Sequence, residues 1–334
     1  MLNIINNIPE GLLSLSASEL HSVLPGPTLL HLQGRRNPPL FISTLLHGNE
    51  ETGWEAARRL LSDYAQRELP RSLSLFIGNI EAARYSERYL DGQRDYNRVW
   101  NAGDSPEHQM MQRIKEEMKQ RGVYLSLDIH NNTGKNPHYA CVNKTYNEFL
   151  QVATLFSRTV VYFLRPEGVQ SIAFSEICPA VTVECGLSKE ISGIEHAYGF
   201  IDACLNLAEI PNHAVKAGDI DLFHTVAVVK VPQQYQFGFD EATYDLQFDK
   251  EIEYFNFHEL TEGTMIGKVR EGIEHPLTIQ DEHDNEVSHQ YFTVEDGEIR
   301  SRCTMIPAMI TVNTEIIRKD CLCYLMERYP LRKT

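Results

Sequence analysis

Long apolar runs, an excess of positive charge and a secretion-signal pattern are all missing from this sequence. No stretch approaches the roughly 18 apolar residues that a membrane-spanning helix needs. The net charge of −15 argues against nucleic acids and anionic membrane surfaces as partners. The first residues carry no basic segment, so they do not form a signal-peptide pattern.

Cysteine motifs are also missing. The seven cysteines are odd in number and scattered, without a Cys-x-x-Cys pair, which argues against a disulfide framework and a zinc knuckle. We therefore expect a reduced, cytoplasmic protein whose cysteines are small buried residues. Apolar residues make up 42% of 334, which is enough for two domains with cores of their own.

The pattern of strands and helices changes near residue 212. Before it, apolar runs typical of strands alternate with amphipathic helical segments, with strands expected at 41–46, 73–77, 123–129, 160–164 and 179–186. After it come short apolar runs separated by turns, with strands expected at 225–231, 254–257, 264–269, 277–279, 291–294 and 309–312. We predict an α/β domain over 1–212, with a mixed sheet flanked by helices, and a smaller, mostly β domain over 213–334.

One turn in the first domain carries a pair of candidate metal ligands. His47 and Glu50 lie between a buried strand and a helix predicted over 54–68. Open α/β sheets place their sites where strands end, and a His and a Glu three residues apart can reach one cation there. Thr52 followed by Glu55 also fits a capping box at the helix start.

This spacing alone is weak evidence for a metal site, because His283 and Glu286 repeat it in a polar run that we expect to be a surface loop. The first pair gains support from two later strand ends. His130 ends one strand, although a single histidine there is more often structural, and Asp128 is expected on the same face. Glu184 ends another, where a carboxylate is costly unless it is paired or close to a metal.

An arginine-rich loop supplies candidate substrate contacts. It includes Arg88, Asn97 and Arg98 in a stretch that has neither helical nor strand periodicity. The loop is either a solvated basic surface or a carboxylate clamp. In the second case Arg98 offers a planar fork for a carboxylate, and Asn97 adds an amide donor.

Together these residues supply the parts of a catalytic zinc site. Two histidines and one glutamate, with a fourth position left for water, form a common catalytic zinc arrangement. The remaining carboxylate, Glu184, is the candidate base that takes the proton from water and passes it to a leaving amine. One arginine would anchor the substrate and a second would hold the developing oxyanion.

The sequence resembles the succinylglutamate desuccinylase/aspartoacylase family, within the zinc carboxypeptidase superfamily. Five motifs run in the family's order through the first domain: His47–Gly–Asn–Glu50, Arg88–Tyr89, Asp95–Tyr–Asn97–Arg98, Leu127–Asp–Ile–His130–Asn and Val183–Glu184–Cys–Gly186. The later stretch 255–264 is similar to the C-terminal β domain of the desuccinylases. The resemblance implies a zinc-carboxypeptidase-like fold with a second domain that caps the active site.

The resemblance also implies a role for each residue. His47, Glu50 and His130 would bind one Zn²⁺ per chain, and Glu184 would act as general base and then as acid. Asn97 and Arg98 would hold a substrate carboxylate, and Arg88 would stabilise the oxyanion. The implied reaction is hydrolysis of the amide bond of a small N-acyl amino acid.

The acyl group and the amino acid stay open at this point. Gln170 stands where aspartoacylases carry an arginine, and Arg165 does not align with that position. Two other functions also fit the residues: a zinc carboxypeptidase acting on peptides, and a zinc-binding ligand sensor without catalytic activity. The presence of both Glu184 and Arg98 argues against the sensor. The sequence does not predict the oligomeric state.

Overall fold

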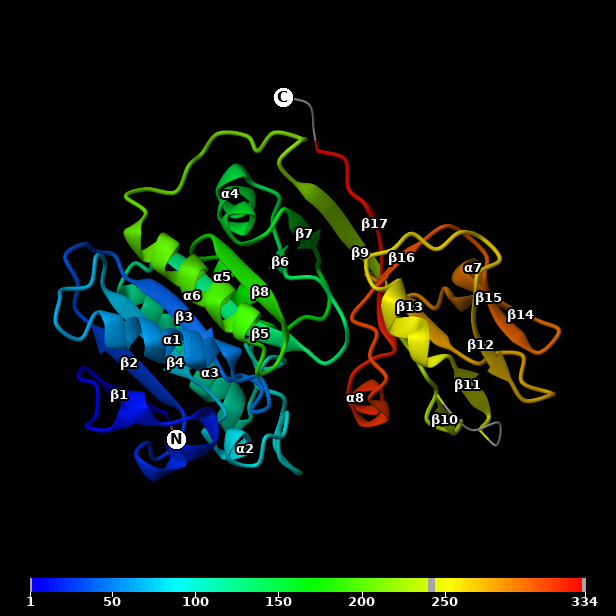
Figure 1. Ribbon diagram of the computed structural model, residues 1–334, viewed down its shortest axis with the longest axis horizontal. Coiled ribbons are helices and arrows are strands. Elements are labelled where there is room, and N and C mark those ends of the chain that lie inside the picture. Colours follow the sequence, from blue (N-terminus) through cyan, green and yellow to red (C-terminus); the bar gives the residue numbers. More distant parts are fainter. Residues whose placement is uncertain (1, 240–243, 332–334) are drawn as a thin grey trace. The chain divides into compact units, whose positions relative to one another are not determined.

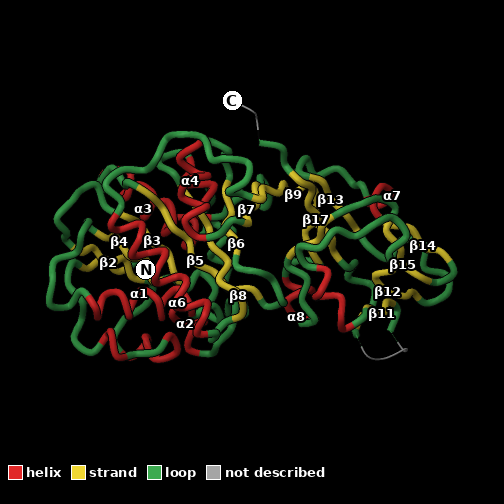
Figure 2. The backbone as a smooth tube through the Cα atoms, turned by 45° about the horizontal axis from the view of Figure 1, so that its top comes forward, coloured by secondary structure: helices red, strands yellow, loops and turns green. Residues whose placement is uncertain are grey.

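The computed structural model describes residues 2–239 and 244–331, and these form two compact units (Figures 1 and 2). The first unit takes in Met1–Asn131, His138–Asp221 and Leu331–Thr334, so far as these are described. The second takes in Asn132–Pro137 and Leu222–Pro330. In the described part of the chain, no helix is both long and apolar enough to cross a bilayer.

The first unit is built on a mixed sheet with the strand order β1-β2-β4-β3-β5-β8-β6-β7. The strands are β1 (Asn3–Ile5), β2 (Thr28–Leu32), β3 (Leu40–Thr44), β4 (Leu73–Ile77), β5 (Leu125–Asn132), β6 (Tyr139–Val142), β7 (Thr159–Tyr162) and β8 (Ala180–Leu187). Strand β3 runs parallel to both β4 and β5, whereas β2 is antiparallel to β4 and β6 is antiparallel to β8. Every residue of β3, β4 and β5 is buried, as expected for central strands covered on both faces.

Helices cover this sheet on both faces. They are α1 (Thr52–Asp63), α2 (Ile80–Arg84), α3 (Pro106–Gln120), α4 (Asn147–Phe156), α5 (Gln170–Ser175) and α6 (Ile191–Asn206), with 3-10 helices η1 (Leu12–Ser14) and η2 (Ala17–Ser22). Helices α1 and α6 lie side by side (Figure 1). Gly53 of α1 lies so close to the sheet that an added Cβ would be 3.0 Å from Thr44. On the other face, Phe174 of α5 stacks on Phe41 with ring centroids 4.6 Å apart.

Local sequence explains most of the helix boundaries, with one correction. Helix α3 begins at Pro106, because the Ser105 hydroxyl accepts from the backbone N–H of His108 and proline suits the first helical position. The predicted capping box at α1 is wrong. Glu51 precedes the helix without a side-chain cap, and Thr52 is already its first residue, so the Thr52 hydroxyl does not cap.

The second unit contains two sheets. One has the order β9-β17-β16 with β13 beside β9, and the other has the order β10-β11-β12-β15-β14. Its elements are β9 (Asp221–Lys230), β10 (Phe237–Gly238), β11 (Leu246–Phe248), η3 (Lys250–Phe255), β12 (Met265–Val269), β13 (Thr278–Asp281), α7 (Ser288–Tyr291), β14 (Phe292–Glu295), β15 (Glu298–Ser301), β16 (Ile306–Ala308), α8 (Thr314–Lys319) and β17 (Cys323–Arg328). Val229, Leu246, Ile279, Ile299 and Leu325 belong to its buried apolar core.

Two predicted strands of the second unit are wrong. Residues 254–257 are not a strand: Tyr254 and Phe255 end the 3-10 helix η3, which Asp249 caps. Residues 309–312 follow strand β16 and lie outside any strand. In both places a four-residue run with three apolar residues carries too little periodicity to separate a strand from other buried segments.

The predicted fold class is confirmed: a mixed α/β sheet flanked by helices is followed by a smaller β-rich part. Residues Asn132–Pro137, which begin with the last residue of β5, belong to the second unit. There the Lys135 carbonyl accepts from Asn256 and the Asn136 side chain accepts from the backbone of Met309. At Gly134 an added Cβ would lie 1.9 Å from the Ile310 carbonyl oxygen, so this close approach requires glycine. The functional division into a catalytic 1–212 and a capping 213–334 stays a prediction.

Candidate metal and catalytic site

The candidate site lies in the first unit, at the carboxyl ends of its central strands. Ser43 of β3 pairs in parallel register with Asp128 of β5, so the residues after β3 and those at the end of β5 meet at one edge of the sheet. After β3, Leu45 adopts a left-handed φ of 55°, which is strained for leucine, and the chain then turns to His47. Gly48 fits there because an added Cβ would lie 2.2 Å from the backbone nitrogen of Ala83.

His47, Glu50 and His130 converge as the sequence predicts. Glu50 Oε1 lies 2.7 Å from Nδ1 of His47, and Glu50 Oε2 lies 2.7 Å from Nδ1 of His130. All three side chains are buried, and one ligand atom from each falls within 4.8 Å of the others. Within residues 2–239 and 244–331, this is the one such group of three.

Two further carboxylates, those of Asp95 and Asp128, hydrogen-bond to the outer nitrogens of the two imidazoles. Nε2 of His47 donates to Oδ1 of Asp95 over 2.9 Å, and Nε2 of His130 donates to Oδ2 of Asp128 over 2.8 Å. The contact between Asp128 and His130 agrees with the strand alternation that the sequence suggested. With the Nε2 protons fixed in this way, both Nδ1 atoms point at Glu50, where either protons or a cation must separate nitrogen from carboxylate. This donor set fits a metal ion.

The pKa values of the three residues are shifted by burial and by their charged neighbours. Burial alone would lower the pKa of His130, but Asp128 and Glu50 outweigh burial and hold this pKa well above its usual value. Burial and Arg88 likewise oppose the charge of His47, while Glu50 and Asp95 raise its pKa overall. Burial would raise the pKa of Glu50, yet the two imidazoles lower it. A divalent cation can replace the shared protons.

Glu184 lies within β8, three residues before the strand ends at Leu187, and it is only 7% exposed. Burial is the main reason that its pKa rises to about 8, and the nearby Glu50 carboxylate adds to the rise although His130 opposes it. A buried carboxyl with such a raised pKa is typical of a group that exchanges protons at neutral pH.

Arg88 is buried against the acidic residues of the site. Its Nε and Nη2 atoms donate to Asp95 Oδ2 over 3.2 and 3.0 Å. Its Nη1 atom lies 3.8 Å from Glu50 Oε1. The structure therefore places Arg88 beside the candidate metal ligands, and its role with the oxyanion stays a prediction.

Asn97 and Arg98 follow on the same loop. The Asn97 side-chain nitrogen lies 3.2 Å from Nε2 of His130, and its oxygen accepts from the backbone N–H of Gln170 over 3.0 Å. Arg98 Nη1 donates to the Asn97 carbonyl over 2.9 Å. Asn97 is thus next to a predicted metal ligand, and Arg98 adjoins Asn97.

Asp95, Ser43 and Asn131 had no role predicted from the sequence. The backbone N–H of Asn131 donates to Glu50 over 3.2 Å, and its side chain accepts from the N–H of Thr52 and donates to the Gly186 carbonyl. Asn131 therefore joins the start of α1 to the end of β8. Its place directly after His130 was the only available signal.

Four residues discussed in the sequence were not assigned to the site: His283, Glu286, Gln170 and Arg165. His283 and Glu286 lie on an exposed turn between β13 and α7, as predicted. The side-chain amide of Gln170 is buried and donates to the Ser126 hydroxyl over 2.6 Å. Arg165 pairs with Glu167 over 2.7 Å.

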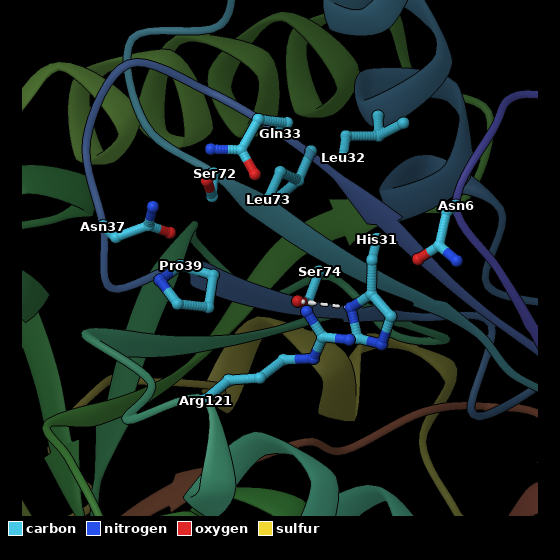
Figure 3. Close-up of a pocket in the computed structure, with 10 residues that line it drawn as sticks. All are labelled: Asn6, His31, Leu32, Gln33, Asn37, Pro39, Ser72, Leu73, Ser74 and Arg121. Atoms are coloured by element: carbon cyan, nitrogen blue, oxygen red, sulfur yellow. Dashed lines mark hydrogen bonds between the residues drawn. The ribbon is translucent and has the colours of Figure 1, made fainter.

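A separate cavity of about 300 Å³ lies at the opposite ends of the same strands, beside the first residues of β3 and β4 (Figure 3). Its lining includes His31, Ser74 and Arg121, and His31 Nδ1 bonds the Ser74 hydroxyl over 2.8 Å. Arg121 Nε donates to Glu117 over 2.8 Å. None of the predicted site residues lines this cavity.

Several solved structures have a similar fold. Succinylglutamate desuccinylase from Chromobacterium violaceum is 16% identical, with a TM-score of 0.57 over 90% of this chain and 87% of that chain. Murine aminoacylase 3 is 15% identical, with a TM-score of 0.57 over 88% and 97%. The ectoine utilization protein EutE (DoeB) from Ruegeria pomeroyi, in a product-bound structure, is 13% identical, with a TM-score of 0.56 over 89% and 88%.

None of the curated proteins matches the sequence of this chain. Residues 36–191 match the family model described as the succinylglutamate desuccinylase/aspartoacylase catalytic domain. This matched segment includes His47, Glu50, His130 and Glu184, together with the loop that carries Arg88 and Arg98. Residues 36–191 of this chain are therefore similar to the catalytic domain of the succinylglutamate desuccinylase/aspartoacylase family.

Proposed function

We propose that the protein is a zinc-dependent hydrolase that cleaves the amide bond of small N-acyl amino acids. The observation that carries this proposal is the buried group of His47, Glu50 and His130, with the protonatable Glu184 beside it. The match of residues 36–191 to the desuccinylase/aspartoacylase catalytic domain supports a deacylase rather than another use of the same ligands.

One Zn²⁺ per chain is the ion that suits these ligands best. Two imidazole nitrogens and one carboxylate match a three-ligand catalytic zinc site, and the absence of thiolates is compatible with it. When bound, Zn²⁺ would lower the pKa of water toward 7 and polarise the carbonyl of the amide. Asp95 and Asp128 hold the outer nitrogens of His47 and His130, so both Nδ1 atoms stay turned toward Glu50.

Glu184 is proposed as the general base and then the general acid. Its ionised carboxylate takes a proton from the attacking water, and the neutral carboxyl then gives that proton to the nitrogen of the leaving amino acid. Such proton transfer needs a pKa close to the working pH. Burial raises the pKa of Glu184, and a nearby cation would lower this pKa again.

Three side chains are proposed to bind and stabilise the rest of the substrate. Arg98 and Asn97 bind the carboxylate of the amino acid, with a guanidinium fork and an amide donor. Arg88 stabilises the oxyanion that forms on the amide carbonyl. Its bonds to Asp95 fix the guanidinium in place before substrate arrives.

All of these residues belong to the first unit. We keep the division into a catalytic domain over 1–212 and a β-rich domain over 213–334 that caps the active site as part of the proposal. The cytoplasmic location also stays a prediction from the cysteine content.

The test is a metal-loaded assay with N-acetyl, N-formyl and N-succinyl amino acids, alongside short peptides with a free C-terminus. We expect amide hydrolysis of at least one acyl amino acid, dependent on zinc. Glu184→Gln should keep the metal and lose turnover by roughly 10²- to 10⁴-fold.

Cleavage of peptides alone would favour the alternative of a zinc carboxypeptidase. Binding of acyl amino acids without turnover, in a protein that holds zinc, would favour the alternative of a ligand sensor. A Glu184→Gln variant with bound zinc and near wild-type turnover would refute the role of Glu184.

A further inference from the structure

The buried Ser43 is linked through Asp128 to His130, one of the proposed metal ligands. The Ser43 hydroxyl donates to Asp128 Oδ1 over 2.6 Å, and Asp128 Oδ2 accepts from Nε2 of His130 over 2.8 Å. Nδ1 of the same imidazole faces Glu50. Ser43, Asp128 and His130 therefore form one line of hydrogen bonds that leads from strand β3 to the metal-ligand group.

The sheet itself sets this arrangement. Ser43 and Asp128 are register partners on the parallel neighbours β3 and β5, so their side chains emerge from the same face of the sheet. His130 follows Asp128 by two residues and shares that face. Neither Ser43 nor Asp128 has any exposed surface, so water does not compete for the bond.

Asp128 depends on Ser43 because it has few other partners. Among the described residues, Ser43 and His130 are the two that hydrogen-bond to its carboxylate. A carboxylate that is fully removed from water needs donors on both oxygens, and losing one leaves a costly unsatisfied acceptor. Without the serine hydroxyl, the carboxylate would be free to rotate about its side-chain bonds.

We infer that Ser43 is a positioning residue for the metal: its hydroxyl holds Asp128, and Asp128 holds His130 in the orientation that binds the ion. This inference rests on the proposed metal site, and it adds a residue that lies two hydrogen bonds away from the cation. Ser43 touches neither the metal nor the substrate.

The experiment measures zinc affinity by competition with a chromophoric chelator, without any substrate. Removing a group that directly supports a metal-binding histidine costs about 10- to 100-fold in affinity. Asp128→Asn should fall in that range, and Ser43→Ala, one step further back, should weaken zinc binding by roughly three- to tenfold. Ser43→Thr restores a hydroxyl and should return the affinity to within about twofold of the wild-type value.

Ser74→Ala is the matched control. Ser74 is also a buried serine, on the neighbouring strand β4, but its hydroxyl bonds His31 rather than a site residue. We expect it to leave zinc affinity unchanged. Circular dichroism and thermal unfolding of the metal-free variants separate a loss of affinity from a loss of structure.

Zinc affinity equal to wild type in Ser43→Ala would overturn the inference, even if that variant were less stable. Equal weakening in Ser43→Ala and Ser74→Ala would overturn it as well, because the effect would then be general. If Ser43→Ala does not fold, Ser43→Thr decides: affinity near wild type supports the inference, and a tenfold loss in a folded chain overturns it. A wild-type chain that binds no zinc would refute the proposed function itself.

Discussion

Replacing Asp95 with asparagine is the most informative single change in the site, because this carboxylate joins a proposed metal ligand, His47, to Arg88, the arginine proposed to stabilise the oxyanion. Asp95 Oδ1 accepts from His47 Nε2 and from the backbone N–H of Asn97, over 2.9 and 2.7 Å. Its Oδ2 accepts from two nitrogens of Arg88. Burial opposes the charge of Asp95, but His47 and Arg88 hold its pKa well below its usual value, so it is ionised at neutral pH.

The hydrogen bonds of Asp95 set the size of the loss in zinc affinity or turnover that we expect for Asp95→Asn. Asparagine keeps the shape but replaces one oxygen with an NH₂ group, which must face either His47 Nε2–H or the guanidinium of Arg88, both of them donors. One of the two therefore loses a charge-assisted hydrogen bond worth about 1.5 to 3 kcal/mol, or roughly 10- to 100-fold in an equilibrium constant. If His47 loses it, zinc affinity falls by that factor. If Arg88 loses it, turnover falls at unchanged zinc affinity.

The assay measures zinc affinity by chelator competition, and kcat and KM with saturating zinc. Asp91→Asn is the control, since Asp91 lies exposed on the same loop. We expect Asp91→Asn to match the wild type in all three quantities. A folded Asp95→Asn variant with wild-type zinc affinity and wild-type kcat would refute the view that Asp95 positions either partner.

Three further predictions concern substrate binding, protons and stability. Arg98→Ala should lower kcat/KM roughly 10- to 100-fold for acyl amino acids and much less for their neutral esters; equal losses on both would indicate a structural arginine. Zinc binding at pH 7 should release about one proton fewer in Glu184→Gln than in the wild type, because burial raises the pKa of Glu184 to about 8 and a cation favours its ionised form. Calorimetry in two buffers measures the number of protons released, and an identical number in both proteins would contradict this prediction. His31 is neutral when folded because burial and Arg121 lower its pKa from 6.5 to about 4, so protonation of the unfolded chain should remove stability as the pH falls below 6.5. His31→Gln should therefore lose less stability than the wild type between pH 7 and 5, by at most about 2 kcal/mol in urea unfolding, and an unchanged difference would contradict this.

The strands of the first unit and the meeting of residues at their ends could be predicted from apolar runs in the sequence. The buried strand before His47, and the strands that lead to His130 and Glu184, are apolar runs bounded by turn residues, and the structure has strands at each place. Residues that end neighbouring parallel strands meet at one edge, so the convergence of His47, Glu50 and His130 could be predicted without a structure.

Other contacts depend on tertiary packing that no local pattern encodes. The loop from Arg88 to Arg98 has no periodicity, so nothing in the sequence showed that Asp95 would face His47. The bond between Ser43 and Asp128 needs the register of β3 against β5, which only the folded sheet sets. Strand β6 was missed because its four residues are too short a run to be distinguished from a loop.

The central claim is that His47, Glu50 and His130 together bind one divalent cation. Equilibrium dialysis against zinc, followed by elemental analysis, tests it directly on the wild type and on single alanine variants of the three residues. We predict about one zinc per wild-type chain, and a large loss of affinity in each folded variant. A folded wild type without zinc, or variants that bind zinc as tightly as the wild type, would contradict the claim.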